Sequence, residues 1–269
     1  MRRALVLGCG GTVGGAWQVG ALAAVRDALG WEPASADVII GTSSGAHLAV
    51  LLGRGLTITD LIAAQRDSSD APAFARRFFT RPPGRWPRLT DRDPAFLDGL
   101  THDLVPGWVP HPATWLVAVS SRGARVAFGS PGAPRTSVAE ALRASWAIPG
   151  WYQSVLIGRR RYFDGGVASP TSADLVPDVD EVVIVAPMVS EARVPGVGGR
   201  LELVLRQRMN RVAAREVASL RARGIRVVRV HPGAAELAAM GWNFMDPARR
   251  LPALEAALTH VPARLRSLA

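Results

Sequence analysis

The sequence predicts a three-layer α/β/α domain with a mainly parallel central sheet. Short β-branched runs alternate with longer segments of helical character along most of the chain. Several of these runs are continuously apolar, without the polar–apolar alternation of a strand that is exposed on one face. Strands buried on both faces need helices on each side of the sheet, and this requirement predicts three layers.

The individual elements follow from the same pattern. Predicted strands cover residues 4–7, 38–41, 114–120, 126–128, 182–186 and 225–230. Predicted helices cover residues 15–29, 44–53, 59–66, 137–145 and 201–223. Residues 68–112 interrupt the alternation, since they are rich in proline, arginine and aromatic residues. This composition predicts a cap-like excursion, which either shapes an acyl pocket near lipid or is an irregular surface segment with a few buried rings.

Length and composition fit a single domain over residues 1–269. Of these residues 48% are hydrophobic and 20% charged, which is enough apolar material for a full core. No segment reaches the roughly 18 apolar residues of a membrane span, and the apolar run at residues 4–7 is too short for a signal peptide. The single cysteine, Cys9, allows no disulfide within the chain. We therefore expect a cytoplasmic protein.

The net charge of +10 comes entirely from arginine, since the chain contains no lysine. Such an excess attracts anionic surfaces, either phospholipid headgroups or nucleic acid. The arginines are scattered and no nucleic-acid-binding motif accompanies them, so we expect peripheral contact with an anionic membrane and no nucleic acid. Arg208, Arg211 and Arg215 share one face of the last predicted helix, which fits a solvated stripe or a membrane contact.

The most informative segment is GTSSG at residues 41–45. An apolar strand precedes it and a helix-forming run follows, which is the strand–turn–helix context of a nucleophile elbow. Without that context, G-x-S-x-G is also an ordinary glycine turn. The turn is so tight that the residues two before and two after the serine must lack side chains, as Gly41 and Gly45 do. Ser43 then lies at the apex, at the N-terminus of a helix whose dipole favours negative charge.

A glycine-rich loop, GCGGTVGG at residues 8–15, follows the first predicted strand. Its backbone N–H groups can converge on an anion and form an oxyanion hole. The rival interpretation is a dinucleotide-binding turn of the form G-x-G-x-x-G. Counting from Gly8 and Gly10, however, the sixth position is Val13, and the acidic residue Asp37 precedes the second strand instead of closing it. The pattern therefore favours the oxyanion hole and no cofactor.

The base that activates the serine is less evident from the residues alone. None of the five histidines lies in a distinctive context: His47, His102, His111, His231 and His260. Asp164 directly follows a short strand and precedes two glycines, which allow a sharp turn and a close backbone approach. The same D-G-G is also an ordinary turn signal. An aspartate, with an ordinary pKa near about 3.9, can act as a base at neutral pH only if burial raises that pKa or if proton transfer is concerted with attack.

Taken together, these motifs resemble the patatin-like phospholipase family. The glycine loop, GTSSG, RASWAIPG at residues 143–150 and DGG at residues 164–166 occur in the order and spacing of that family over residues 5–170. The segment GWNFMDPARR at residues 241–250 is also similar to the closing segment of bacterial members. We expect residues 143–150 to pack beside the site, near the strand that carries Asp164.

The resemblance implies a Ser–Asp dyad without histidine, in which Ser43 is the nucleophile and Asp164 the base. It implies oxyanion donors at the backbone amides of Gly10, Gly11 and Thr12. Supporting turns are implied at four glycines: Gly41, Gly45, Gly165 and Gly166. The chain departs from many members at Val13, where they carry arginine or lysine, and at Ser44, where they carry alanine; we expect Ser44 to be passive.

The implied activity is hydrolysis of fatty-acyl esters of lipids, of the phospholipase A or lysophospholipase type, without a metal or an organic cofactor. Two alternatives share the same residues: a non-catalytic lipid-binding or regulatory protein, and an acyltransferase that uses the same dyad. The expected partners are the lipid substrate and an anionic membrane, with peripheral attachment at its inner surface. The sequence predicts no oligomeric state.

Overall fold

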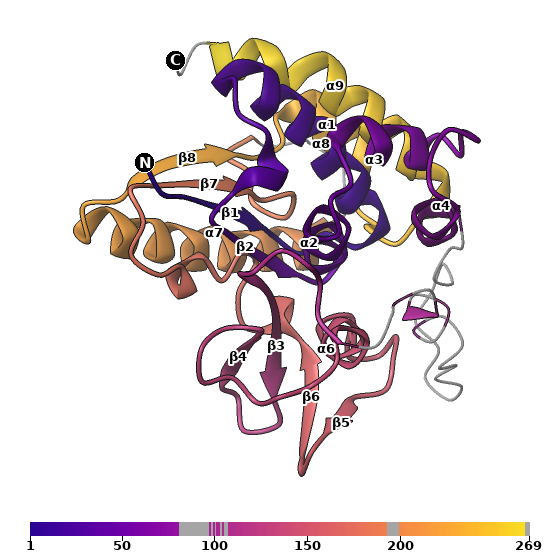
Figure 1. Cartoon of the computed structure of the whole chain (residues 1–269). Coiled ribbons are helices and arrows are strands. Elements are labelled where there is room, and N and C mark those ends of the chain that lie inside the picture. Colours follow the sequence, from indigo (N-terminus) through magenta and orange to yellow (C-terminus); the bar gives the residue numbers. More distant parts are fainter. Residues whose placement is uncertain are drawn as a thin grey trace.

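A computed structural model of the chain describes residues 1–80, 107–192 and 199–266, together with residues 97, 99, 101, 102 and 104. A mixed sheet forms the middle layer and helices cover both of its faces (Figure 1). The predicted three-layer α/β/α fold is therefore confirmed.

The sheet has a parallel part and an antiparallel part. The parallel strands pair in the order β3 (Thr114–Ser120), β2 (Val38–Thr42), β1 (Arg3–Leu7), β7 (Glu181–Val185) and β8 (Arg226–Val230). The antiparallel strands are β4 (Arg125–Phe128) and β6 (Arg160–Asp164), which both pair with β3, and β5 (Val155–Ile157), which pairs with β6. The site described below lies where the two parts of the sheet meet.

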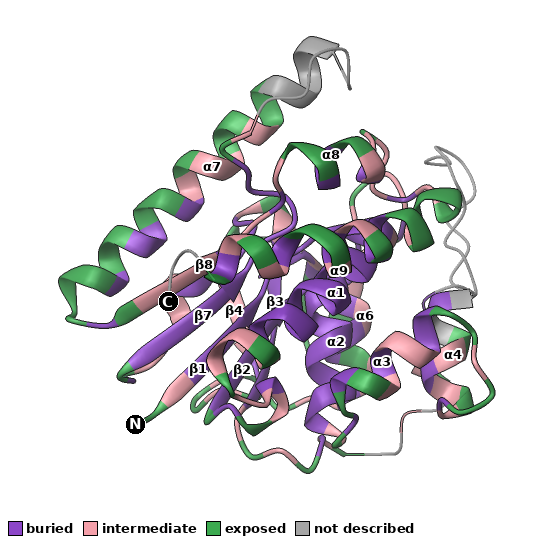
Figure 2. Ribbon diagram, turned by 90° about the horizontal axis from the view of Figure 1, so that it is seen from above, coloured by how far each residue is buried: buried purple, intermediate pink, exposed green. Residues whose placement is uncertain are grey.

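Side chains of the parallel strands point alternately to two separate cores. Leu5 and Leu7 of β1 contact the larger core, whereas Ala4 and Val6 contact the smaller one. The helices that contribute to the larger core are α1 (Gly11–Leu29), α2 (Ser44–Gly53), α3 (Ile58–Gln65), α4 (Ala73–Thr80), α6 (Val138–Ser145), α8 (Ala234–Met240) and α9 (Arg250–Arg266). Helix α7 (Gly199–Ala222) covers the smaller core on the other face, with its outer side exposed (Figure 2).

Two features of the helical layer differ from the prediction. Helix α1 begins at Gly11, four residues before the predicted start, because contacts with the rest of the fold stabilise a glycine-rich first turn. Helices α8 and α9 were not predicted. Helix α9 contains Pro262, and it packs so closely along α1 that a Cβ on Gly20 would lie 2.7 Å from that of Ala257. Such a contact is visible only in three dimensions.

Part of the excursion at residues 68–112 is described. Helix α4 is anchored to the domain by Phe79, which is buried, and by Phe74, over whose ring the Arg54 guanidinium lies at 4.0 Å. Most of the remaining excursion, including residues 81–96, lies outside the described residues, so its role as a cap stays a prediction, as does the single domain over residues 1–269. Among the helices that the structure describes, none combines the length and the apolar character needed to cross a bilayer.

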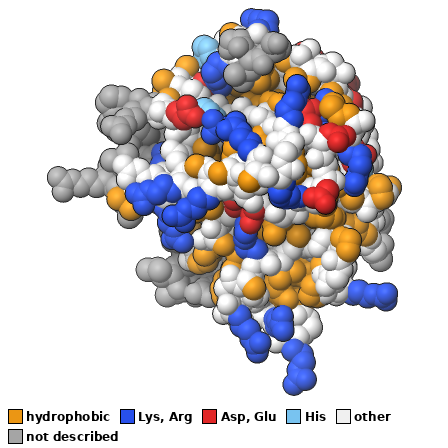
Figure 3. Space-filling view, turned by 90° about the vertical axis from the view of Figure 1, so that its left-hand side faces the viewer, with side chains coloured by type: hydrophobic (Ala, Val, Ile, Leu, Met, Phe, Trp, Pro, Cys, Tyr) orange, Lys and Arg blue, Asp and Glu red, His pale blue; other side chains and the backbone are white. Residues whose placement is uncertain are grey.

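Figure 3 shows the face toward which the amino ends of β1, β7 and β8 point. Arginine side chains are spread over this face among acidic and apolar groups, some of them side by side. Among the described residues, several arginines form ion pairs within the fold: Arg3 and Arg226 both pair with Glu181, and Arg223 pairs with Asp178. Part of the positive charge of the chain therefore has local carboxylate partners.

Candidate active site

Ser43 occupies a tight turn between the end of β2 and the first residue of α2. Its backbone has φ 57° and ψ −121°, a conformation that is costly for a residue with a side chain. A Cβ on Gly41 would lie 2.3 Å from the carbonyl oxygen of Gly45, and a Cβ on Gly45 would lie 2.1 Å from that of Leu7. Only glycine fits at either position, which is the steric reason inferred from the spacing of GTSSG.

The segment at residues 143–150 fixes both sides of the site. The Ser43 N–H donates to Oγ of Ser145 at 2.9 Å, and this Oγ donates to the carbonyl oxygen of Val117 at 2.7 Å. The backbone N–H of Asp164 donates to the carbonyl oxygen of Ala147 at 3.0 Å. The segment was expected to pack beside the site; in the structure it also bonds to both residues of the predicted dyad.

Asp164 meets Ser43 because β2 and β6 end against each other. Both strands pair with the same edge of β3, since β4 occupies the other edge. At the end of parallel β2, Thr42 pairs with Val117; at the end of antiparallel β6, Asp164 pairs with the next residue, Ala118. The carboxyl ends of the two strands therefore face each other, and the side chain of Ser43 forms a hydrogen bond with Asp164.

The carboxyl group of Asp164 has an unusual environment. Ser43 and Asp164 are only 2% and 3% exposed. Burial raises the pKa of Asp164 from 3.8 to about 7, although the hydrogen bonds from Ser43 and from the Gly166 N–H, at 2.7 Å, lower it. A pKa raised by burial was one of the two conditions under which an aspartate was expected to act as a base at neutral pH, the other being proton transfer concerted with attack. The pKa lies in the range where a carboxylate is most effective as a general base near pH 7.

Cys9 also lies at the site but differs from Ser43 in reactivity. Burial raises the pKa of its thiol well above the usual range, and the nearby charge of Asp164 raises it further. The group is therefore a neutral thiol at physiological pH, which is a weak nucleophile.

The glycine loop leads directly into helix α1. The backbone N–H groups of Cys9 and Val13 in this loop already have acceptors within the protein. The Cys9 N–H donates to the Pro170 carbonyl oxygen at 2.9 Å, and the Val13 N–H donates to the Phe244 carbonyl oxygen at 3.0 Å. The N–H groups of the three residues between them, Gly10, Gly11 and Thr12, have no acceptor among the described residues. These are the amides that the family resemblance implied as oxyanion donors, and they lie at the N-terminal end of a 19-residue helix.

A cavity of about 150 Å³ opens beside these groups. Ser43, Asp164, Gly10 and Gly11 line it, together with Cys9 and Gly166, whereas Thr12 does not. The other lining residues are apolar: Ile148, Val167, Met188, Leu205, Met209 and Phe244. The structure thus brings the predicted nucleophile, base and two of the three predicted oxyanion donors to one apolar cavity.

Several residues of this site were not predicted. Ser145 was not singled out, although it belongs to the RASWAIPG motif. The apolar wall from α7, Leu205 and Met209, follows no local motif. Phe244 lies in the GWNFMDPARR segment, and a Cβ on Gly11 would lie 2.6 Å from its ring, so this segment closes the cavity over the glycine loop.

None of the five histidines is among the described residues that line the cavity. His47 follows Ser43 by one helical turn and is buried against Phe79, with ring centroids 6.2 Å apart, and burial lowers its pKa well below the usual range. His111 contacts the Ala36 carbonyl oxygen at 2.7 Å and Oγ1 of Thr114 at 2.9 Å. In the described part of the chain, no group of three or more potential ligands (His, Cys, Asp or Glu) is placed to hold a metal ion.

One family model matches more than half of the chain. The family model described as patatin-like phospholipase matches residues 5–176, which include the glycine loop, Ser43 and Asp164. The search of curated proteins returned no match. Among solved structures, the chain is similar to the crystal structure of VipD from Legionella pneumophila, with a TM-score of 0.47 and 12% sequence identity. That similarity covers 98% of this chain and 66% of VipD, so the chain spans just under two thirds of that protein.

Proposed function

The chain belongs to the patatin-like phospholipase family, and on this basis we propose that it hydrolyses fatty-acyl esters of lipids, with Ser43 as nucleophile and Asp164 as general base. The observation that carries the proposal is the hydrogen bond between Ser43, at a strained turn, and a buried carboxyl group of raised pKa. The substrates we propose are phospholipids or lysophospholipids.

The reaction follows from the positions of these groups. The Oγ of Ser43 attacks the ester carbonyl carbon while its proton passes to the Asp164 carboxylate. The C–O bond to the alcohol then breaks, and Asp164 returns the proton to the leaving oxygen. A water molecule next attacks the acyl carbon of the acyl-enzyme while Asp164 accepts its proton. The bond between that carbon and Oγ then breaks, Asp164 returns the proton to Oγ, and the fatty acid and the free serine are released. Burial of Asp164 supports this role, because it brings the pKa of the base to about 7.

The oxyanion of each tetrahedral intermediate needs hydrogen-bond donors that are already in place. The amides of Gly10, Gly11 and Thr12 are suited to this role, since they have no acceptor among the described residues. Many family members carry arginine or lysine at the position of Val13. Because valine has no side-chain donor, the hydrogen bonds to the oxyanion would come from the backbone of the loop.

The cavity lining supports a substrate with an acyl chain. Beyond Ser43 and Asp164 the wall is made of aliphatic, methionine and phenylalanine side chains, which bind a hydrocarbon chain without unsatisfied polar groups. A substitution that fills this wall, such as Met209→Trp, is therefore expected to move the preferred chain length toward shorter esters.

The rim of the cavity supports contact with an anionic membrane. Val167 and Leu205 line the cavity and are also 48% and 39% exposed, and Trp242 nearby in the closing segment is 53% exposed. Within residues 204–222 of α7 the single carboxylate, Glu216, is buried, whereas arginines occupy the outer side. Apolar side chains at a mouth flanked by positive charge are suited to a headgroup surface, where they insert while the arginines meet phosphates.

Two experiments test this proposal. The first measures product release from p-nitrophenyl esters of increasing chain length by wild type, Ser43→Ala and the matched control Ser44→Ala. We expect turnover by wild type and by the control, and none by Ser43→Ala. Equal rates in all three proteins would refute Ser43 as the nucleophile. Binding of lipid vesicles without turnover would favour a non-catalytic lipid-binding protein, and a new ester formed with an added alcohol would favour acyl transfer.

The second experiment measures co-sedimentation with vesicles that contain or lack anionic phosphatidylglycerol. Wild type is expected to bind the anionic vesicles, and binding is expected to fall in the triple variant Arg208→Gln, Arg211→Gln, Arg215→Gln. Binding that is the same with neutral vesicles, or unchanged in the variant, would contradict the proposed membrane contact.

A further inference from the structure

Helix α7 carries a carboxylate inside the protein, away from the dyad. Glu216 is 5% exposed and lies among apolar residues of the smaller core, which include Ala213, Val217 and Leu220. An apolar side chain would fit this layer without the desolvation penalty of a charge, since buried ionic groups seldom add net stability over well-packed hydrophobic ones. The carboxylate therefore requires an explanation other than core packing.

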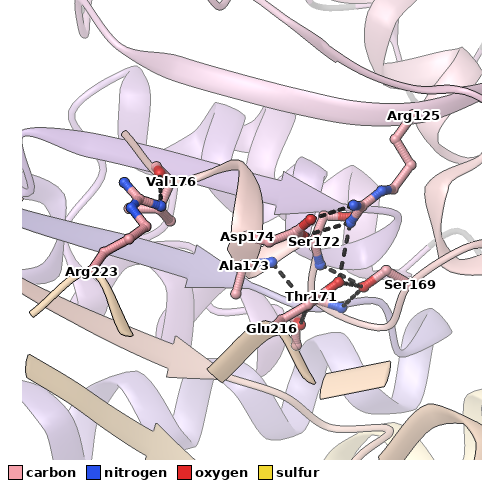
Figure 4. A network of polar contacts seen from close by, with 9 residues as sticks. All are labelled: Arg125, Ser169, Thr171, Ser172, Ala173, Asp174, Val176, Glu216 and Arg223. Carbon is pink, nitrogen blue, oxygen red and sulfur yellow. Dashed lines mark hydrogen bonds and ion pairs between the residues drawn. The ribbon is translucent and has the colours of Figure 1, made fainter. Parts of the chain in front are cut away.

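Its contacts converge from one short segment of backbone (Figure 4). Oε1 accepts from the Ser169 hydroxyl at 2.5 Å, and Oε2 accepts from the Thr171 hydroxyl and from the Ala173 N–H at 3.0 Å. The Ser169 hydroxyl oxygen in turn accepts from the backbone N–H groups of Thr171 and Ser172, at 3.1 Å and 2.8 Å. Residues 169–173 are thus wrapped around the Glu216 carboxylate.

The wrapped segment is held in a conformation that it would not adopt unaided. Ser172 has φ 53° and ψ 34°, in the left-handed region that is unfavourable for a residue with a side chain. Arg125, on β4, also belongs to this network. Its guanidinium contacts Glu216 at 3.1 Å and forms a bidentate ion pair with Asp174, on the more exposed side of the network (Figure 4).

This segment bonds to both halves of the proposed active site. The carbonyl oxygen of Pro170 accepts from the Cys9 N–H at 2.9 Å, which fixes the glycine loop one residue before the proposed oxyanion donors. In the other direction, the Ser169 N–H donates to the Gly165 carbonyl oxygen at 3.2 Å and closes the turn whose Gly166 N–H bonds Asp164. A shift of residues 169–171 would therefore move the oxyanion loop and the base together.

We propose that Glu216 is a positioning residue for the reaction: its buried carboxylate orders residues 169–173, which hold the glycine loop and the Asp164 turn in register with Ser43. The assignment of a catalytic consequence rests on the proposed function, whereas the ordering of the loop does not. Misplacement of reacting groups by about 1 Å costs on the order of 10²-fold in rate, so a small relaxation of this segment is sufficient to be measured.

The variant that tests the proposal is Glu216→Gln, which keeps the shape but replaces one acceptor oxygen with an amide NH₂. Thr171→Val is a milder second variant that removes one hydroxyl contact and keeps the side-chain volume. Glu181→Gln is the matched control, because it makes the same change at another buried carboxylate, which lies at the amino end of β7 and pairs with Arg3 and Arg226.

The first readout is kcat per active site, with sites counted by titration with a fluorophosphonate, so that unfolded molecules do not enter the rate. We expect Glu216→Gln to lose about 10- to 100-fold in kcat with KM within about twofold, and Thr171→Val to lose less. The double variant should be no slower than Glu216→Gln alone, since both changes act through one contact. The control should keep the wild-type kcat. A Glu216→Gln enzyme of lower stability but wild-type kcat per titrated site would overturn the proposal.

The second readout is hydrogen exchange of the Cys9 amide, which does not depend on turnover. Faster exchange in Glu216→Gln, with the control unchanged, is expected; equal exchange in wild type and Glu216→Gln would overturn the ordering role. If wild type turns over no ester, the proposed function fails, and the exchange result still decides whether Glu216 orders the glycine loop.

Discussion

Replacing Asp164 with asparagine should strongly reduce activity and yet stabilise the protein at alkaline pH. Burial raises the pKa of Asp164 from 3.8 to about 7. Because the folded-state pKa lies above the unfolded value, the group stabilises the fold most below pH 3.8 and loses this contribution as the pH rises through about 7. The full difference corresponds to about 4 kcal/mol in the free energy of unfolding. Asparagine carries no charge and avoids this loss.

Urea unfolding of wild type and Asp164→Asn at about pH 5 and about pH 8.5 measures the effect. Between these two pH values the free energy of unfolding of wild type should fall by about 3 kcal/mol relative to that of the variant. The unfolded and folded pKa values of Asp164, 3.8 and about 7, lie about three pH units apart, and about two of these units lie above pH 5. In parallel, kcat of the variant should fall by about 10²- to 10⁴-fold through loss of the base. A stability difference that is the same at both pH values would refute the raised pKa. A wild-type kcat/KM profile with its acid limb near pH 4 would refute it independently.

Three further predictions concern residues that support the site. Ser145→Ala leaves the buried amide of the nucleophile without its acceptor, so it should cost about 1–3 kcal/mol in urea unfolding and lower kcat; wild-type stability and kcat would contradict the role of this hydrogen bond. Gly45→Ala places a Cβ 2.1 Å from the carbonyl oxygen of Leu7, so little folded protein should be seen by circular dichroism; a variant that melts like wild type would contradict the packing. Glu140→Gln keeps the capping box and removes the negative charge from the first turn of α6, so it should cost about 0.5 kcal/mol or less near neutral pH in urea unfolding. That difference should shrink in acid, because a hydrogen bond from the Ser137 N–H lowers the pKa of Glu140.

The sequence was sufficient to predict those parts of the site that depend on local geometry. Strand, tight turn and helix follow one another in the sequence around Ser43. The glycines two residues before and two residues after it indicate a turn that leaves no room for a Cβ. The glycine loop was recognised in the same way, because an oxyanion hole made of backbone needs small residues at a helix start. The role of Asp164 could be assigned only through the family resemblance, since D-G-G by itself is also an ordinary turn.

The remaining features depend on contacts between distant segments. The meeting of Ser43 and Asp164 requires that β2 and β6 share one edge of β3, a pairing that no local pattern reveals. The network around Glu216 joins residues that are 43 to 47 positions apart in the sequence. The apolar wall from α7 is likewise contributed by a segment far from Ser43 in the sequence. The early start of α1 shows the same limit, because its glycines have low helix propensity and the helix is stabilised by tertiary packing.

Labelling with a fluorophosphonate, followed by mass mapping of the modified peptide, tests whether Ser43 and Asp164 work together as nucleophile and base. We predict a single adduct on the peptide that contains Ser43, retained in Ser44→Ala, absent in Ser43→Ala and formed much more slowly in Asp164→Asn. An adduct on another residue, or labelling of Asp164→Asn at the wild-type rate, would contradict the assignment of the dyad.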